Sequence, residues 1–241
     1  MLFFFKEKPI EITAVIHENY VVAHKTAPIV PARERFPDWW KKIPSSKFDW
    51  DEFGPSTSIK SCPGVGHTLQ QGFIMSLWSD LAFKFEGDTF RWRFSDNRSE
   101  TTFQPRRSYP GFYEDYNTFN ILSPWIMLTP VKLHYSYPFY LLDSPPPYIT
   151  PPGVVTPFLN TCATNVFAMF KQQVGLNTYF IKKNTPMLHI IPLTEKKINF
   201  KCEILDDKEY NKHRSAISTP THFVSKGLKH FNEEEKLKRN S

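Results

Sequence analysis

The segment from Leu81 to Phe94 most constrains what this chain can fold into. Its apolar side chains fall at every second position, at 81, 83 and 85 and again at 90, 92 and 94, on either side of Gly87-Asp88. Side chains of a strand alternate between two faces, and a Gly-Asp pair suits a tight two-residue turn. The segment therefore predicts an antiparallel β-hairpin whose core residues are Phe83, Phe85, Trp92 and Phe94.

The composition favours strands and extended loops over long helices. The chain has 241 residues, with 21 prolines, only 9 glycines and 16% aromatic residues. A proline inside a helix removes a backbone hydrogen bond and clashes with the preceding turn, and all-β chains of this length commonly form one domain. We therefore expect a mainly β, antiparallel domain of jelly-roll or double-stranded β-helix type over residues 1–200. It includes an N-terminal arm, and a polar, partly helical tail follows over residues 201–241.

Further strands are expected where β-branched and aromatic residues cluster. Residues 10–23 predict one or two strands, and residues 124–130 predict a short buried strand. Two further strands are predicted at 166–170 and 178–181. Residues 185–193 are interpreted as the last core strand. Between the first and second groups, Pro37 and Asp38 suit the start of a single helical turn, which Pro44 ends.

Charge and cysteine content bear on partners and compartment. The net charge is +6, but no run of five like charges occurs, so nucleic-acid binding is permitted rather than required. Three cysteines, Cys62, Cys162 and Cys202, cannot all pair within one chain, and we expect three buried, reduced thiols. The sequence lacks a signal-peptide core and an apolar run of membrane length, so we expect no membrane partner and no classical export.

No residue pattern in the sequence predicts a catalytic or metal centre. None of the eight histidines has His, Asp or Glu two positions later, the spacing that lets one strand present two metal ligands on one face. We therefore predict no catalytic residue, metal or cofactor. One pocket hypothesis remains, in which His67, His134 and His189 from separate segments converge with Asp80. Alternatively, Asp80 bonds to a neighbouring backbone turn, since buried carboxylates are usually paired.

Two regions are candidates for contact with a partner. Trp39 and Trp40 are adjacent on a proline-bounded arm and cannot face one direction, so they either anchor the arm on the core or contact another molecule. Between residues 91 and 116, arginines alternate with aromatic residues in a polar segment. Such segments on a β scaffold often carry recognition, although an ordinary surface loop is the alternative. The candidates there are Arg93, Arg98, Arg106, Arg107 and Tyr109.

Five motifs occur in a distinctive order along the chain. They are PDWWKKIP at 37–44, IKSCPG at 59–64, GFIMSLWSDL at 72–81, WIMLTP at 125–130 and KNTPMLHIIP at 183–192. In this order they resemble an uncharacterised family of proteins encoded by tailed phages of marine bacteria and by some bacteria. The resemblance covers residues 28–197. It implies a jelly roll or double-stranded β-helix and no established activity.

The resemblance and the residues together predict a non-enzymatic, phage-encoded protein that works by binding. It would be a virion component, or an accessory protein in the cytoplasm of the infected host cell, that binds a protein partner or itself. One alternative is a cupin-like enzyme that binds a small molecule or metal at the barrel mouth. The other is a nucleic-acid-binding accessory protein that uses the arginines between residues 91 and 107.

Overall fold

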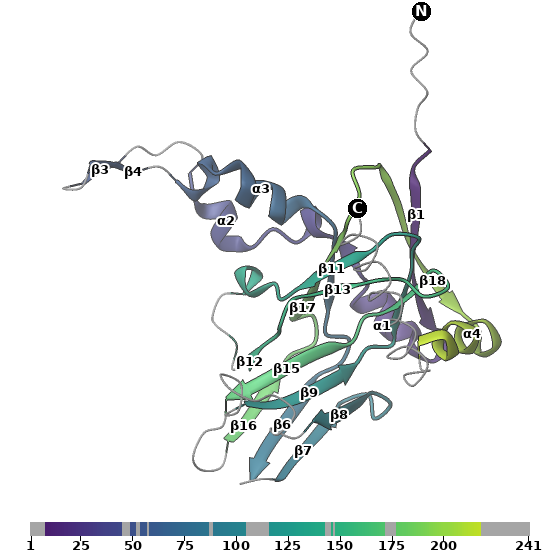
Figure 1. Ribbon diagram of the computed structural model, residues 1–241. Coiled ribbons are helices and arrows are strands. Elements are labelled where there is room, and N and C mark those ends of the chain that lie inside the picture. Colours follow the sequence, from purple (N-terminus) through teal and green to yellow (C-terminus); the bar gives the residue numbers. More distant parts are fainter. Residues whose placement is uncertain are drawn as a thin grey trace, which may run out of the picture.

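The computed structural model describes residues 8–44, 49–51, 54–56, 58–86, 89–104, 116–142, 146, 148–171 and 177–217. Within these residues the protein is mainly β, with five sheets and several short helices (Figure 1). Almost all strand pairs are antiparallel. The expected β-sandwich or jelly-roll class is confirmed.

Two four-stranded sheets are joined by strands that bend. Their strands are β1 (Ile10–His17), β8 (Glu100–Gln104), β9 (Tyr116–Leu122), β10 (Trp125–Leu128), β12 (Tyr148–Ile149), β14 (Thr161–Ala163), β15 (Val166–Lys171) and β18 (Ile198–Leu205). The sheet orders are β14-β10-β1-β18 and β12-β15-β9-β8. β9 continues into β10, and β14 into β15, so the two sheets meet at these breaks. The backbone N–H of Ser123 donates to Asn165 Oδ1 at 3.1 Å and ties the two breaks together.

The opposite side of the sandwich has the same construction. Its strands are β2 (Val30–Pro31), β5 (Phe73–Ser76), β6 (Leu81–Glu86), β7 (Thr89–Phe94), β11 (Leu133–Ser136), β13 (Gly153–Val155), β16 (Asn177–Ile181) and β17 (Pro186–Pro192). They form sheets of order β13-β11-β17-β5-β2 and β16-β6-β7. Where β5 passes into β6 and β16 into β17, Leu77 exchanges backbone hydrogen bonds of 2.8 Å with Thr185 and Asn184. The fifth sheet pairs β3 (Asp49–Asp51) with β4 (Gly54–Ser56).

The centre of the core is aromatic. Phe83 of β6 lies with its ring centroid 5.2 Å from both Phe119 of β9 and Phe170 of β15. Phe119 and Phe170 are 5.6 Å apart and nearly perpendicular. All three are fully buried, and such offset or edge-on ring pairs stabilise beyond their buried area. These rings join the two sides of the sandwich.

The predicted hairpin is confirmed for its two strands, but one of its proposed core residues is wrong. β6 and β7 pair antiparallel, with Phe83 opposite Trp92. Phe94 is 3% exposed and stacks on Trp78, whereas Trp92 is 42% exposed. β7 is the edge of its sheet, and its Phe94 end lies against the body of the protein. The turn residues Gly87 and Asp88, and the burial of Phe85, lie outside the described part of the chain.

Four α-helices and several 3-10 turns complete the described structure. The helices are α1 (Val21–Thr26), α2 (Asp38–Lys42), α3 (Pro63–Gln70) and α4 (Asp207–Ile217), and the turns are η1 (Glu18–Tyr20), η2 (Ala32–Glu34), η3 (Ile59–Ser61) and η6 (Phe139–Leu141). The helical turn predicted within 37–44 is confirmed as α2. The strand predicted over 10–23 ends at His17, because the His17 ring accepts the backbone N–H of Asn19 and starts a helical segment. Among the described residues, no helix is long and apolar enough to cross a membrane.

The strand predicted over 185–193 is present as β17, but it is not the last strand. The chain continues into β18, which pairs parallel with β1 through all eight of its residues and extends beyond residue 200. α4 then crosses the outer face of this sheet, where Tyr210 packs against Val15 and Ile126. The segment that follows residue 200 is therefore part of the folded sheet before it becomes helical.

The three cysteines are free, but they are not all buried. Cys162 is buried and Cys202 is partly buried, whereas Cys62 is exposed at the start of α3. The expectation of three buried thiols is therefore wrong for Cys62. Its neighbours Lys60 and Pro63 belong to a surface turn and helix start, and not to a strand.

Candidate functional site

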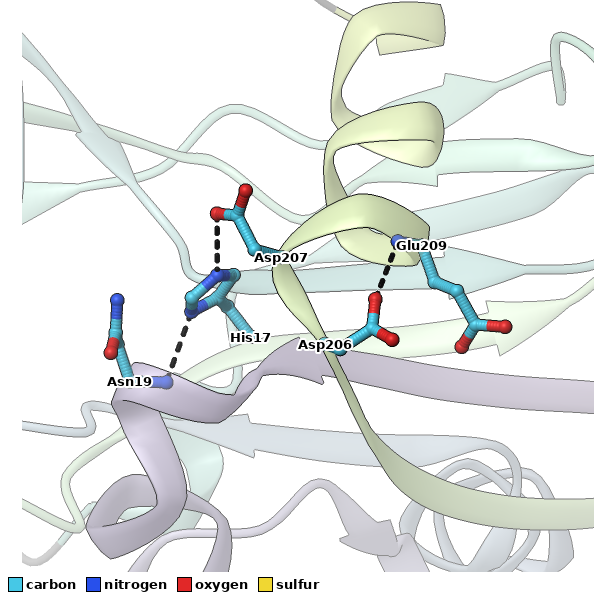
Figure 2. A network of polar contacts seen from close by, with 5 residues as sticks. All are labelled: His17, Asn19, Asp206, Asp207 and Glu209. Carbon is cyan, nitrogen blue, oxygen red and sulfur yellow. Dashed lines mark hydrogen bonds and ion pairs between the residues drawn. The ribbon is translucent and has the colours of Figure 1, made fainter.

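A polar cleft of about 760 Å³ opens between α4 and the ends of β1, β9 and β14. We call it the α4 cleft. Its volume falls within the range of about 300–1,000 Å³ that is usual for ligand pockets. Figure 2 shows part of its wall, where His17 at the end of β1 points toward Asp207 at the start of α4. The side chains that decide its chemistry are His17, Arg98, Asn165, Asp207, Tyr210 and Arg214.

The parallel pairing of β1 with β18 creates this site. It places Leu205 beside His17, so the helix that begins at Asp207 starts directly over the end of β1. The helix start is capped by Asp206, whose Oδ1 accepts the backbone N–H of Glu209 at 2.8 Å (Figure 2). Such a cap satisfies one of the free N–H groups of the first turn. Residues 190 positions apart thereby form one wall of the cleft.

Both ring nitrogens of His17 are engaged by the framework. Nδ1 accepts the backbone N–H of Asn19 at 3.0 Å, and Nε2 lies 3.1 Å from Asp207 Oδ1. A backbone N–H can only donate, so Nδ1 is the acceptor and Nε2 carries the proton that is donated to the carboxylate. His17 therefore positions α4 and has no nitrogen left to act as a base on a ligand.

Tyr210 of α4 provides a second contact that holds the helix against the sheet. Its hydroxyl donates to the carbonyl of Pro124 at 2.8 Å, and its ring meets the His17 ring edge-on at 5.2 Å. Burial raises the pKa of Tyr210 to about 12, so the phenol is neutral near pH 7. The hydroxyl proton is already donated to the Pro124 carbonyl, so Tyr210 anchors the helix.

Two arginines give the cleft its positive character. Arg98 and Arg214 line it from the loop after β7 and from α4, and both are exposed. Among the described residues neither forms an ion pair, and the one carboxylate that lines the cleft, Asp207, is bound to His17. Arg98 Nη1 donates to the carbonyl of Asn19 at 2.6 Å, which fixes the guanidinium beside the cleft. A guanidinium has five N–H donors, so further donors remain for a ligand.

The floor of the cleft is a hydrogen-bonded polar corner. Ser123 Oγ accepts the backbone N–H of Trp125 at 3.1 Å and the hydroxyl of Thr164 at 2.9 Å. Asn165 Oδ1 accepts the Ser123 N–H, so this side chain lines the cleft with its oxygen already bonded. Satisfied networks of this kind are rigid. The floor is therefore preformed.

The partner residues predicted from the sequence do not form one surface. Arg98 lies at the α4 cleft, and Arg93 is exposed on the edge strand β7. Trp39 Nε1 donates to the carbonyl of Tyr140 at 2.7 Å, which anchors α2 on η6. Trp40 stacks with Phe36 and lies beneath the amine of Lys60, and both tryptophans are partly buried. The remaining candidates lie outside the described residues: Arg106, Arg107 and Tyr109.

The four residues of the pocket hypothesis are only partly brought together. His189 of β17 lies opposite Ser136, two positions from His134 on β11. His67 is exposed on α3, and Asp80 Oδ1 accepts the backbone N–H of Lys183 at 2.7 Å. Asp80 thus makes the backbone contact that was the alternative. Among the described residues, no group of three or more metal-ligating side chains is present.

His189 forms a buried chain of hydrogen bonds of its own. Its Nε2 donates to the carbonyl of Gln71 at 2.7 Å, and its Nδ1 bonds to the hydroxyl of Tyr140. Because a carbonyl only accepts, the Nε2 proton is fixed and Nδ1 accepts from Tyr140. The chain joins β17, η6 and the turn before β5. It also supports the carbonyl to which Trp39 is anchored.

We expect the stability of the protein to fall as the pH drops below about 6.5, the usual pKa of histidine. Burial lowers the pKa of His189, so the unfolded chain binds a proton in a pH range where the folded protein does not, and acid favours unfolding there. Urea denaturation across this range should show a smaller slope with pH for His189→Gln than for the wild type. His67→Gln is the control, since His67 is exposed on α3. An unchanged slope in His189→Gln would contradict the assignment.

The sequence did not reveal the α4 cleft as a site. Arg98 was a candidate, but His17, Asp207, Tyr210 and Arg214 were not. One signal was present: Tyr210 and Arg214 are four residues apart in a helix-prone segment that begins with Asp206-Asp207. That spacing places them on one helix face, but nothing local indicates which strand end the face covers.

Comparison of the chain with protein-family models, with curated proteins and with solved structures finds no match.

Proposed function

We propose that this is a non-enzymatic binding protein whose α4 cleft receives an anionic group of its partner. The observation that carries the proposal is the pair of arginines, Arg98 and Arg214, at a cleft whose single lining carboxylate is bound to His17. Guanidinium groups bind carboxylates and phosphates through paired, charge-assisted hydrogen bonds. A carboxylate or phosphate of the partner would therefore be held between α4 and the loop after β7.

The state of the other polar groups favours binding over catalysis at this cleft. A general base needs a free nitrogen or oxygen within reach of the substrate. The His17 nitrogens are bonded to Asn19 and Asp207, and the Tyr210 hydroxyl is bonded to Pro124. These groups hold the helix in place, which suits a preformed recognition site.

The phage context of this function rests on the resemblance of the five motifs. We propose that the chain serves either in the virion or as an accessory protein in the infected cell, where it binds a protein partner. Mass spectrometry of purified particles separates the two roles. Peptides of this chain at a constant ratio to the major capsid protein support the virion role, and their absence removes it.

Anion binding is tested by calorimetric titration with inorganic phosphate and with citrate. Arg214→Ala and Arg98→Ala should each weaken binding about tenfold, because each removes a charged hydrogen bond of about 1.5 kcal/mol or more. Lys212→Ala is the matched control, since it removes one positive charge from an exposed position of α4 that does not line the cleft.

Unchanged binding by Lys212→Ala together with loss in both arginine variants supports the proposal. Equal losses in all three variants would show that binding follows overall charge. That outcome, or no binding of either anion by the wild type, would contradict a specific anion site in the cleft.

A further inference from the structure

The outer edge of β18 is a long strand edge. β18 ends the sheet of order β14-β10-β1-β18 and has eight residues, whereas β14 at the other end has three. In the described part of the chain no strand pairs with this edge, and Figure 1 shows β18 on the outer side of β1. An edge of this length presents backbone N–H and C=O groups that are suited to pairing with another strand.

The core-facing side chains of β18 are incompletely covered. Ile12, Ala14 and Ile16 of β1 are fully buried, but the residues beside them on β18 are not. Phe200 and Cys202 are partly exposed, and Ile204 is 40% exposed. The difference arises because β1 has a strand on each side and β18 has a strand on one side only. One more strand would cover this apolar row.

The helix that follows β18 leaves this edge open. α4 packs on Val15 and Ile126, so it runs from the end of β18 across β1 and β10. It moves away from the free edge. None of the β18 residues lines the α4 cleft, and the edge is a surface separate from that site.

The charges on β18 fit a second copy of the same strand. On the outer face, Lys201 and Glu203 are about half exposed and form an ion pair of 2.7 Å. Two copies related by a two-fold axis perpendicular to the sheet run antiparallel. With the axis at Cys202, Lys201 of each copy lies opposite Glu203 of the other, and Phe200 lies opposite Ile204.

The neighbouring registers are disfavoured by the same charges. Because both copies must direct their apolar rows to one face, the strands can shift only in steps that keep this alternation. One step places Lys201 opposite Lys201, and the other places Glu203 opposite Glu203. Like charges directly opposite each other destabilise an antiparallel pair.

We propose that two copies of this chain associate through their β18 edges, antiparallel and centred on Cys202. The two sheets then form one continuous sheet of order β14-β10-β1-β18-β18-β1-β10-β14. The paired edges satisfy their backbone groups, and each copy covers the apolar row of the other. The interface is isologous, so the assembly closes as a dimer and does not extend into a fibre.

Charge reversal tests the register. In sedimentation velocity from micromolar to submillimolar concentration, the wild type should form a dimer. Lys201→Glu and Glu203→Lys each place two like-charge pairs across the axis, and each should raise the dissociation constant about tenfold. The double variant restores both opposite-charge pairs and should restore the dimer. Lys212→Glu, on α4, is the control and should leave the dimer unchanged.

Each variant is first shown to be folded by its thermal melt. If one charge-reversal variant does not fold, the register is tested with the other charge-reversal variant and the double variant. A wild type that stays monomeric over this range would overturn the proposal. A dimer that neither reversal weakens would also overturn it.

Oxidation provides a second measurement of the register. The proposed axis brings the two Cys202 residues opposite each other, with Cα atoms at a separation that a disulfide spans. Diamide should link them, being reduced to its hydrazine as the two thiols lose their hydrogens. Since burial raises the pKa of Cys202 to about 11, the reaction is run at alkaline pH. In a Cys62→Ser background a linked dimer should form, and its formation should be lost in Cys202→Ser. A link that persists without Cys202 would contradict the register.

Discussion

Replacing Phe83 by alanine should lower the free energy of unfolding by about 3–5 kcal/mol, as is typical of large aromatic truncations in a core. Phe83 is fully buried and packs on Phe119 and Phe170, each 5.2 Å away. These rings belong to different sheets, so their surroundings cannot close around the space without moving both sides of the sandwich. Urea denaturation with an unchanged m-value would measure the loss.

Trp92→Ala is the matched control for this prediction. Trp92 lies directly opposite Phe83 in the hairpin but is 42% exposed. Its removal deletes a larger side chain from the same pair, yet less of the deleted surface was buried. The loss should therefore be clearly smaller than for Phe83→Ala. Equal losses in the two variants would mean that the hairpin packs differently from the structure.

The contrast between these residues shows what periodicity can predict. Alternation along residues 81–94 identified the hairpin and the face that each side chain occupies. It could not show how far the opposing sheet extends along that face. Phe94 is covered by Trp78, whereas Trp92 lies farther along the edge strand. Burial at a given position depends on another part of the chain, and the pattern of the strand itself does not contain it.

Long-range pairing explains the other differences. The parallel partner of β1 is β18, which lies near the other end of the described chain. Parallel strands need no tight turn between them, so no turn signal marks the pair. The α4 cleft depends on this pairing, so the sequence could not indicate that His17 and Asp207 would meet. Arg98 was a candidate only because it lies in the polar segment where arginines alternate with aromatic residues. Trp39 is similar: its arm was recognisable, but its bond to the Tyr140 carbonyl spans 101 positions.

Gly72→Ala should be among the most damaging single-methyl changes in the protein. Gly72 has φ +67°, a conformation that costs an ordinary L-residue about 1–2 kcal/mol. A Cβ at this position would overlap the carbonyl oxygen of Ile190 and would lie 3.0 Å from the Ile191 Cα. Both atoms are backbone of β17, so no side-chain rotation relieves the contact.

The damage should extend beyond the turn. β17 lies between β11 and β5, and it carries His189, whose Nε2 donates to the carbonyl of the adjacent Gln71. Moving β17 away from Gly72 lengthens that buried bond and disturbs the β5 pairing. The strain and the displaced backbone together should cost at least about 3 kcal/mol.

Gly66→Ala provides a control of opposite sign. Gly66 is inside α3, and a Cβ there would meet no atom within 4 Å. Alanine in a helix interior is favoured over glycine by about 0.5–1 kcal/mol, so this variant should be slightly more stable than the wild type. Denaturation of the two variants side by side separates the effect of an added methyl group from the effect of its position. If Gly72→Ala were as stable as the wild type, the close approach of this turn to β17 would be wrong, and with it the hydrogen-bond chain that joins Gln71, His189 and Tyr140.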